Sequence, residues 1–225
     1  MLDCCYTANS IDIGSDRVGP VNTIAWTGIA ISHVAHLLSV LALYDTTRTI
    51  FKHIPGFTTL PYIASSLHII SPAGMFLSAP YMEASFSCLC FAGYSLFSRA
   101  TFASSPTSKD ALQLVSAVLM GLAVSVRANG LLNGLLFMHE ALLCCTDLFQ
   151  KGIDFSRLRR LGIAGICGCV VGLGYVVPQY LAYTEYCTHE ASSGARPWCA
   201  SSVPSIYNFV QSHYWQVAML RLDTD

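Results

Sequence analysis

The residues of this chain that could carry chemistry are a few polar side chains set among long apolar runs. Glu83 follows residues 71–82, a segment that contains Pro72 and Pro80. A charge at the centre of a bilayer costs ~3 kcal/mol or more, so a carboxylate in such a region should face a cavity or a partner. It could instead lie at the membrane interface, where it would stabilise a helix N-terminus through the helix dipole. The residues alone leave both interpretations open.

Arg127 begins a second polar segment, which reads Arg-Ala-Asn-Gly-Leu-Leu-Asn-Gly over residues 127–134. A guanidinium offers a planar fork of donors that suits a phosphate or a carboxylate. Asn129 and Gly130 tolerate backbone conformations that bulkier residues avoid, so we expect the chain to turn or bend here. The alternative is an ordinary tight loop whose arginine reaches for the interface.

Aromatic residues are dense in a third polar segment, which runs from Glu185 to about Trp215. Trp and Tyr at this density are typical of the interfacial belt of a membrane protein. A surface on which a sugar ring stacks is the other interpretation. The belt is the role that we expect for most of them.

Metal chemistry and disulfide frameworks have little support in the sequence. His33 and His36 have a spacing that can bind metal, but without nearby carboxylates such a pair usually packs, and we expect no metal site. The ten cysteines lack the paired C-x2-C spacing of zinc sites. Cys187 and Cys199 share the long polar stretch, and only this pair could form a disulfide. Phosphate-binding loops, dinucleotide fingerprints and nucleophile elbows are also missing, which leaves soluble-enzyme chemistries without a motif.

Composition then indicates what kind of scaffold must position these residues. The 225 residues are 53% hydrophobic and only 11% charged, with a net charge of −1, and the mean hydropathy is +0.51. A soluble domain carries roughly 25% charged residues. The composition excludes a disordered chain and a basic nucleic-acid binder. It predicts an all-α polytopic membrane protein.

Runs of mostly apolar residues with few or no charges predict about six transmembrane helices, each of which needs about 20 such residues. Residues 1–20 lack the basic and apolar regions of a signal peptide, so the first of these helices should itself direct insertion. The two helices on either side of Pro80 are the least regular and could be shorter, tilted or re-entrant. The six predicted spans are residues 21–43, 60–79, 81–97, 111–126, 131–148 and 161–182.

Six spans place alternate loops on opposite sides of the membrane. The loops 45–57, 99–110 and 150–160 carry eight of the twelve Lys and Arg residues. The positive-inside rule makes these loops cytosolic. Both termini, the turn at Pro80 and the turn at Arg127 then face the lumen or exterior. We therefore divide the chain into a non-cytosolic segment 1–20, a helical membrane domain 21–183 and a lumenal loop and tail 184–225.

Several of these segments resemble motifs of the GPI mannosyltransferase 2 family. Residues 70–84, Ile-Ser-Pro-Ala-Gly-Met-Phe-Leu-Ser-Ala-Pro-Tyr-Met-Glu-Ala, resemble its Ser-Pro-Ala…Ala-Tyr-x-Glu segment. Residues 126–133 look like its Arg-Ser-Asn-Gly signature, with Ala128 in place of the serine. Residues 178–180 and 197–221 are similar to its long lumenal loop. The motifs occur in the family's order, and their combination is specific although no single one is.

The resemblance implies a partial GT-C type fold and a glycosyltransferase of the endoplasmic reticulum membrane. The donor would be dolichyl-phosphate-mannose, and no separate cofactor is implied. The acceptor would be the first mannose of the lipid-linked GPI precursor, extended in the lumen through an α-1,6 bond as the second mannose is added. A small membrane subunit would be the partner, and no nucleic acid would bind.

Inverting transfer from a phosphate-linked sugar needs a base, a group that stabilises the departing phosphate, and a cleft that aligns the substrates. Arg127 is the candidate for the phosphate, with Asn129 and Gly130 shaping its turn. The family's acidic base lies in a Trp-Asp-x-x-His-Phe type stretch with no counterpart before Val21, so no catalytic base is assigned. The candidates for positioning the acceptor or the loop are Glu83, Trp198, Tyr214 and Trp215.

Family members are roughly twice as long as this chain, so we expect a fragment, a truncated gene model or a decayed copy. A catalytically incomplete membrane scaffold is therefore the alternative function. A transporter, which would use the broken helices near Pro80 at the middle of the membrane, is a weaker alternative because no inverted repeat is visible.

Overall fold

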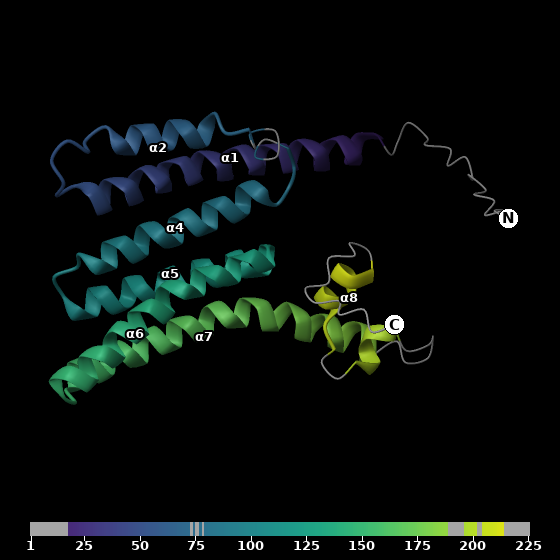
Figure 1. Cartoon of the computed structure of the whole chain (residues 1–225). Coiled ribbons are helices and arrows are strands. Elements are labelled where there is room, and N and C mark those ends of the chain that lie inside the picture. Colours follow the sequence, from purple (N-terminus) through teal and green to yellow (C-terminus); the bar gives the residue numbers. More distant parts are fainter. Residues whose placement is uncertain are drawn as a thin grey trace, which may run out of the picture.

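The computed structural model describes residues 18–72, 74, 77, 79–188, 196–201 and 204–213. Every regular element within these ranges is helical (Figure 1). Three short elements, η2 (Ala128–Asn133), η3 (Thr184–Thr188) and η4 (Pro197–Ala200), accompany the longer helices. The longer helices are α1 (Val18–Phe51), α2 (Leu60–Ile69), α4 (Glu83–Thr101), α5 (Pro106–Val126), α6 (Gly134–Lys151), α7 (Phe155–Tyr183) and α8 (Ile206–His213).

The long helices lie side by side, with α4 packed between α1 and α5, and α5 packed on α7 (Figure 1). Helix α2 packs on the outer side of α1, and α6 packs on α7. The buried core joins α5, α6 and α7 through Met120, Phe137 and Val171, each fully buried. Much of the remaining apolar surface is exposed, including Trp26, Leu41 and Val176. This inside-out pattern is what a helix bundle in lipid requires, because lipid tails are as apolar as leucine.

Four helical segments are long and apolar enough to cross a membrane, which confirms the prediction of an all-α membrane protein. They correspond to the first, fourth, fifth and sixth predicted spans. The prediction of six spans is not reproduced among the described residues. The four segments are Asn22–Phe51, Pro106–Val126, Ala128–Lys151 and Phe155–Cys187.

The predicted span over residues 60–79 is not one continuous helix, which agrees with the shorter segment that the sequence left open. Helix α2 ends at Ile69, and residues 70–72 are not helical. Pro72 explains the end of the helix, because a proline disfavours the helical conformation of the residue before it and cannot donate a backbone hydrogen bond. Ten helical residues reach about 15 Å, roughly half of a bilayer core. Residue Pro80 then lies against Gly28, near the N-terminal end of α1.

Ion pairs join neighbouring helices at the end of the bundle where α4 ends and α5 begins. Asp45 of α1 accepts two hydrogen bonds from Arg99 of α4, at 2.7 and 2.9 Å. Glu140 of α6 pairs with Lys109 of α5 at 3.2 Å and with Arg160 of α7 at 2.8 Å. All three cations, Arg99, Lys109 and Arg160, belong to the loops predicted to be cytosolic. The pairs extend α1 and α4 beyond the predicted spans, because each partner neutralises the charge that would otherwise end an apolar helix.

Candidate functional site

Arg127 and Glu83, which are 44 residues apart in the sequence, meet at the opposite end of the bundle. Glu83 is the first residue of α4, and Arg127 is the residue at which α5 ends. The Arg127 guanidinium donates from Nη1 to Oε2 of the Glu83 carboxylate and forms an ion pair. It also lies over the Phe86 ring, 5.8 Å from its centre. Glu83 therefore has the partner that a carboxylate in an apolar region needs.

The backbone around Arg127 makes a sharp return. Arg127 is extended, with φ −146° and ψ 129°. Its N–H donates to the carbonyl of Ala123, and its own carbonyl accepts from the N–H of Gly130 at 2.8 Å. A Cβ on Gly130 would lie 2.8 Å from the backbone nitrogen of Val124, closer than real Cβ atoms come. Only glycine allows the chain to fold back this tightly on the end of α5.

The 3-10 helix η2 carries the chain from this return to the middle of α4. Asn133, which is buried, donates from Nδ2 to Sγ of Cys90 at 3.3 Å. Its Oδ1 accepts from the Tyr94 hydroxyl at 2.5 Å. Helix α6 therefore begins at Gly134, beside the centre of α4, and not at Leu131 as predicted. Glu83, Arg127 and η2 together form one connected unit.

A cleft of about 490 Å³ lies beside Arg127, between the end of α5, the C-terminal half of α7 and helix α8. Ligand pockets are typically about 300–1,000 Å³. Arg127 is the one charged residue among the described side chains that line it. The Arg127 side chain is 40% exposed, so it pairs with Glu83 and still reaches the cleft. The lining residues are Val124, Ser125, Val126, Arg127, Ala128, Asn129, Gly174, Tyr175, Pro178, Gln179, Tyr207 and Gln211.

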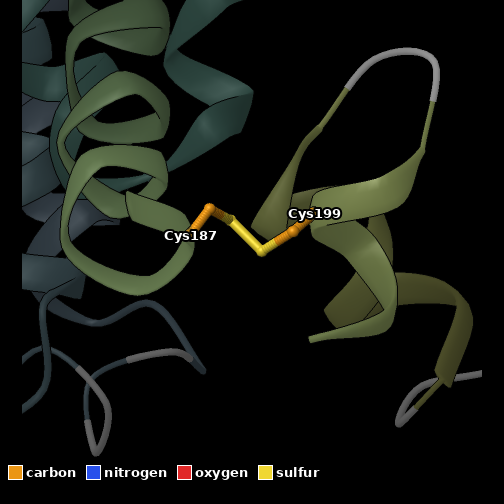
Figure 2. The surroundings of a disulfide bond; sticks show 2 residues. All are labelled: Cys187 and Cys199. Atoms are coloured by element: carbon orange, nitrogen blue, oxygen red, sulfur yellow. A yellow bond between two sulfur atoms is a disulfide. The ribbon is translucent and has the colours of Figure 1, made fainter. Parts of the chain in front are cut away.

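The segment after α7 forms the outer wall of the cleft. Cys187 and Cys199, the pair that the sequence left able to bridge, form a disulfide between η3 and η4 (Figure 2). Oε1 of Gln179 accepts hydrogen bonds from the Ser205 hydroxyl at 3.1 Å and from the N–H of Tyr207 at 3.3 Å. The disulfide and this amide together hold the start of α8 against α7.

The structure brings only some of the predicted site residues together. Arg127 and Asn129 line the cleft, Gly130 forms the return behind them, and Glu83 pairs with Arg127. Trp198 is buried, with 4% of its surface exposed, and it is not among the residues that line the cleft. Tyr214 and Trp215, the other aromatic candidates, lie outside the described residues.

The cleft also contains polar residues that were not among the predicted site residues, although some of them belong to segments similar to the family's lumenal loop. Tyr175 and Gln179 come from the part of α7 that lies within the predicted span 161–182. Tyr207 and Gln211 come from α8, where the ring of Tyr207 meets that of Tyr175 edge-on at 6.0 Å. A glutamine near the end of an otherwise apolar helix is the signal that was available for Gln179.

The two histidines considered for metal binding have other partners. Nδ1 of His33 lies 2.8 Å from the carbonyl of Ile29. The His36 ring faces that of His68, whose Nε2 lies 2.9 Å from the Ser39 hydroxyl. In the described part of the chain, no three His, Cys, Asp or Glu side chains gather as a metal site would require.

Comparison with known proteins places this geometry in a family context. The sequence profile of the family described as mannosyltransferase (PIG-V) matches residues 17–223. The GPI mannosyltransferase 2 of Aspergillus oryzae is 45% identical over 199 residues, which is 87% of this chain and 45% of that protein. The protein of the same name from Chaetomium globosum is 42% identical over 88% of this chain and 45% of its own length.

A third relative, GPI mannosyltransferase 2 of Gibberella zeae, is 40% identical over 90% of this chain and 47% of its own length. The chain therefore spans about half the length of the curated relatives that it matches. No solved structure matches the chain.

Proposed function

The chain belongs to the mannosyltransferase (PIG-V) family, and on this premise we propose that it carries the phosphate-binding part of a GPI mannosyltransferase site. The proposed donor is dolichyl-phosphate-mannose and the proposed acceptor is the lipid-linked GPI precursor, which receives its second mannose in α-1,6 linkage. The proposed location is the endoplasmic reticulum membrane, which the protein crosses several times, with the site on the lumenal side. A small membrane subunit is the proposed partner.

The observation that carries this proposal is the position of Arg127 at the edge of a ligand-sized cleft. Mannosyl transfer breaks the bond between C1 of mannose and the phosphate oxygen, while the acceptor hydroxyl forms a new bond to C1. Negative charge grows on the departing dolichyl phosphate, and a fixed guanidinium stabilises that charge. Glu83 binds Nη1 and so fixes the group, whereas Nε and Nη2 carry further N–H donors.

The acceptor hydroxyl must also lose its proton to a base. No carboxylate is found among the described residues that line the cleft. Glu83 already accepts from Arg127, and its role in the proposal is to orient that guanidinium. The proposal therefore assigns phosphate stabilisation to this chain and leaves the base unassigned.

The charge distribution supports a lumenal site. Arg99, Lys109 and Arg160 lie at the end of the bundle opposite the Glu83–Arg127 pair. Cations concentrate on the cytosolic side of membrane proteins, which leaves the Arg127 end on the lumenal side. The disulfide at this end is consistent with a lumenal position, because the lumen of the endoplasmic reticulum is oxidising.

A non-catalytic membrane scaffold is the second candidate, and the lack of a carboxylate in the described cleft lining favours it. Complementation separates the two candidates. The chain would be expressed in cells that lack the second GPI mannosyltransferase, alongside a chimera in which it replaces the matching segment of the Aspergillus oryzae relative. An enzyme fragment predicts that the chimera restores the dimannosylated precursor. A scaffold predicts that it does not, although the unmodified relative does.

In that chimera, Arg127→Ala should lower the rate of mannosyl transfer by about 10²–10³-fold, the usual cost of removing a preorganised charge-stabilising donor. Arg127→Lys should recover part of the rate, because lysine keeps the positive charge. The recovery should be incomplete, because lysine lacks the paired N–H donors of the planar guanidinium. Arg48→Ala, in the last turn of α1 and at the other end of the bundle from Arg127, is the matched control and should keep the wild-type rate. Normal transfer by the Arg127→Ala chimera would remove the phosphate role.

A further inference from the structure

Gln179 is held in one orientation within the cleft. The N–H of Tyr207 is an obligatory donor, so the atom of Gln179 that it contacts at 3.3 Å must be the amide oxygen. The Ser205 hydroxyl also donates to this oxygen, at 3.1 Å, and accepts in turn from the N–H of Asn208 at 3.3 Å. This network settles the oxygen and nitrogen positions, which the amide alone would leave ambiguous.

The side-chain amide of Gln179 has an acceptor oxygen and a donor NH2 group. The residues at the start of α8 use only the oxygen. Oε1 accepts two hydrogen bonds from the start of α8. Gln179 also lines the cleft. Its NH2 group, with two donors, is thereby set as a fixed donor at the cleft wall, and its rotation is prevented by the contacts on the oxygen.

The neighbours of this donor suit a sugar better than a second phosphate. The cleft wall on the α7 and α8 side is formed by Tyr175, Pro178, Tyr207 and Gln211, all uncharged. Tyrosine rings and neutral amides are the groups that present an apolar face together with a few placed hydrogen bonds. The one charged lining residue, Arg127, comes from α5.

We propose that Gln179 is a sugar-binding residue whose amide NH2 donates to a hydroxyl oxygen of mannose. This inference rests on the proposed function and adds a sugar subsite to its phosphate site. The tail that carries Ser205 and Tyr207 thus has a role in recognition, because it fixes the direction of the Gln179 amide. The mannose could belong to the donor or to the acceptor, which share this chemistry.

The test is the affinity of the purified chain for lipids that differ by one hydroxyl. Dolichyl-phosphate-mannose and its single-deoxy analogues form one arm, and the mannosylated GPI precursor with its deoxy analogues forms the other. One deoxy analogue in one arm should bind the wild-type chain about tenfold more weakly, the effect of one lost hydrogen bond. The arm in which this occurs identifies the mannose.

Gln179→Glu is the informative variant, because a carboxylate still accepts from Ser205 and Tyr207 but has no NH2 to donate. In this variant the tenfold preference for the hydroxyl should fall to about one, while the segment after Tyr183 stays as protease-resistant as in the wild type. Because the preference is a ratio within one protein, the added negative charge cancels from it. Ser205→Ala, which keeps the amide donors, should retain most of the preference.

Two results would overturn the assignment. The first is a hydroxyl preference that Gln179→Glu leaves unchanged. The second is an equal loss of affinity for the mannosylated lipid, its deoxy analogues and dolichyl phosphate, which would assign the amide to the phosphate. An inactive chimera together with a Gln179-dependent hydroxyl preference would contradict the proposed function and leave the sugar subsite standing.

Discussion

At the scale of single residues, the site depends on polar groups that find their partners across long stretches of sequence. Arg127 meets Glu83, Asn133 meets Tyr94, and Gln179 meets Ser205. Each pair joins segments that are far apart in the sequence, and each hydrogen bond is partly buried. Buried polar groups cost free energy unless they are hydrogen-bonded, so these pairs also fix the geometry of the elements that carry them.

Asn133→Ala should destabilise the bundle by about 1–2 kcal/mol, because it leaves the Tyr94 hydroxyl without its acceptor in a part-buried position. Unfolding of the purified chain in detergent, compared with that of the wild type, measures the change. Tyr94→Phe removes the other partner and serves as the second arm of a double-mutant cycle. Strictly additive effects of the two changes would show that this hydrogen bond contributes nothing.

The sequence predicted the identity of several site residues but not their contacts. Arg127 and Glu83 stood out because charge is rare in apolar runs. Their pairing was not predictable, because it depends on how α4 packs against α5. Trp198 was a candidate for positioning the acceptor or the loop, and only the fold shows that it is buried.

At the scale of elements, the close contact of α5 and α7 positions the cleft. A Cβ on Gly174 would lie 2.1 Å from the carbonyl oxygen of Gly121. Glycine at both positions lets the two backbones approach, as small residues do in membrane helix pairs. Tyr175 and Gln179 follow on α7 within the next turn and a half, so their position relative to Arg127 depends on this approach.

Gly174→Ala should therefore separate α5 from α7 and destabilise the chain by about 1–3 kcal/mol, the usual cost of overpacking. The same unfolding assay in detergent measures this. Gly165→Ala, on the same helix with nothing within 4 Å of its Cβ, is the matched control. It should be neutral, or more stable by up to about 1 kcal/mol through helix propensity. Equal effects of the two substitutions would contradict the close helix contact.

The start of α7 should respond to acid. The Ser156 hydroxyl and N–H both donate to the Asp154 carboxylate, and the hydroxyl contact foremost holds the pKa of this carboxyl below its ordinary value of 3.8. Because the pKa is lowered in the folded state, the stabilisation is complete well above pH 3.8 and is lost as the pH falls through the lower folded value.

Thermal unfolding at several pH values would check this cap. Wild type should be more stable than Asp154→Ala at neutral pH, and the difference should begin to shrink below about pH 4 and be lost as the pH falls through the lowered folded-state pKa of Asp154. Asp154→Asn keeps a capping oxygen that does not titrate, and its stability relative to Asp154→Ala should stay constant. A difference between wild type and Asp154→Ala that persists in strong acid would contradict the role of the ionised carboxylate.

Helix positions followed from the sequence where apolar runs were long, and failed where proline or a charge pair intervened. The C-terminal ends of α5 and α7 were predicted within one residue, whereas the two helices begin at Pro106 and Phe155, before the predicted starts at residues 111 and 161. The predicted helix 60–79 ended at Ile69 because Pro72 follows. Helix α1 continues through Asp45 to Phe51 because Arg99 neutralises the Asp45 carboxylate. The positions of the charges in the sequence alone predicted an earlier end.

At the scale of the whole molecule, the two ends of the bundle differ in kind. One end holds the ion pairs of Asp45 and Glu140 with cations of neighbouring helices. The other end holds the Glu83–Arg127 pair, the cleft and the disulfide. Charge counting predicted this division, since it depends only on which loops alternate. The cleft was not predictable, because it requires the packing of three elements.

A glycosylation scan should find the two ends on opposite sides of the membrane. An acceptor loop inserted after Ser201 should be glycosylated, whereas the same loop inserted after Ser104 or Ile153 should not. An insertion after Phe57 tests the α1–α2 connection in the same way and should stay unmodified. Glycosylation after both Ser104 and Ser201 would show that the helices do not alternate as the bundle requires.

The Cys187–Cys199 disulfide also allows the progress of membrane insertion to be followed by non-reducing gel electrophoresis. Both thiols follow α7, so they can reach an oxidising compartment only after that helix has crossed completely. Reduced and oxidised chains from a pulse-chase experiment would then report how many molecules have finished translocating at each moment. The redox state of this cysteine pair would therefore report how far membrane insertion has progressed.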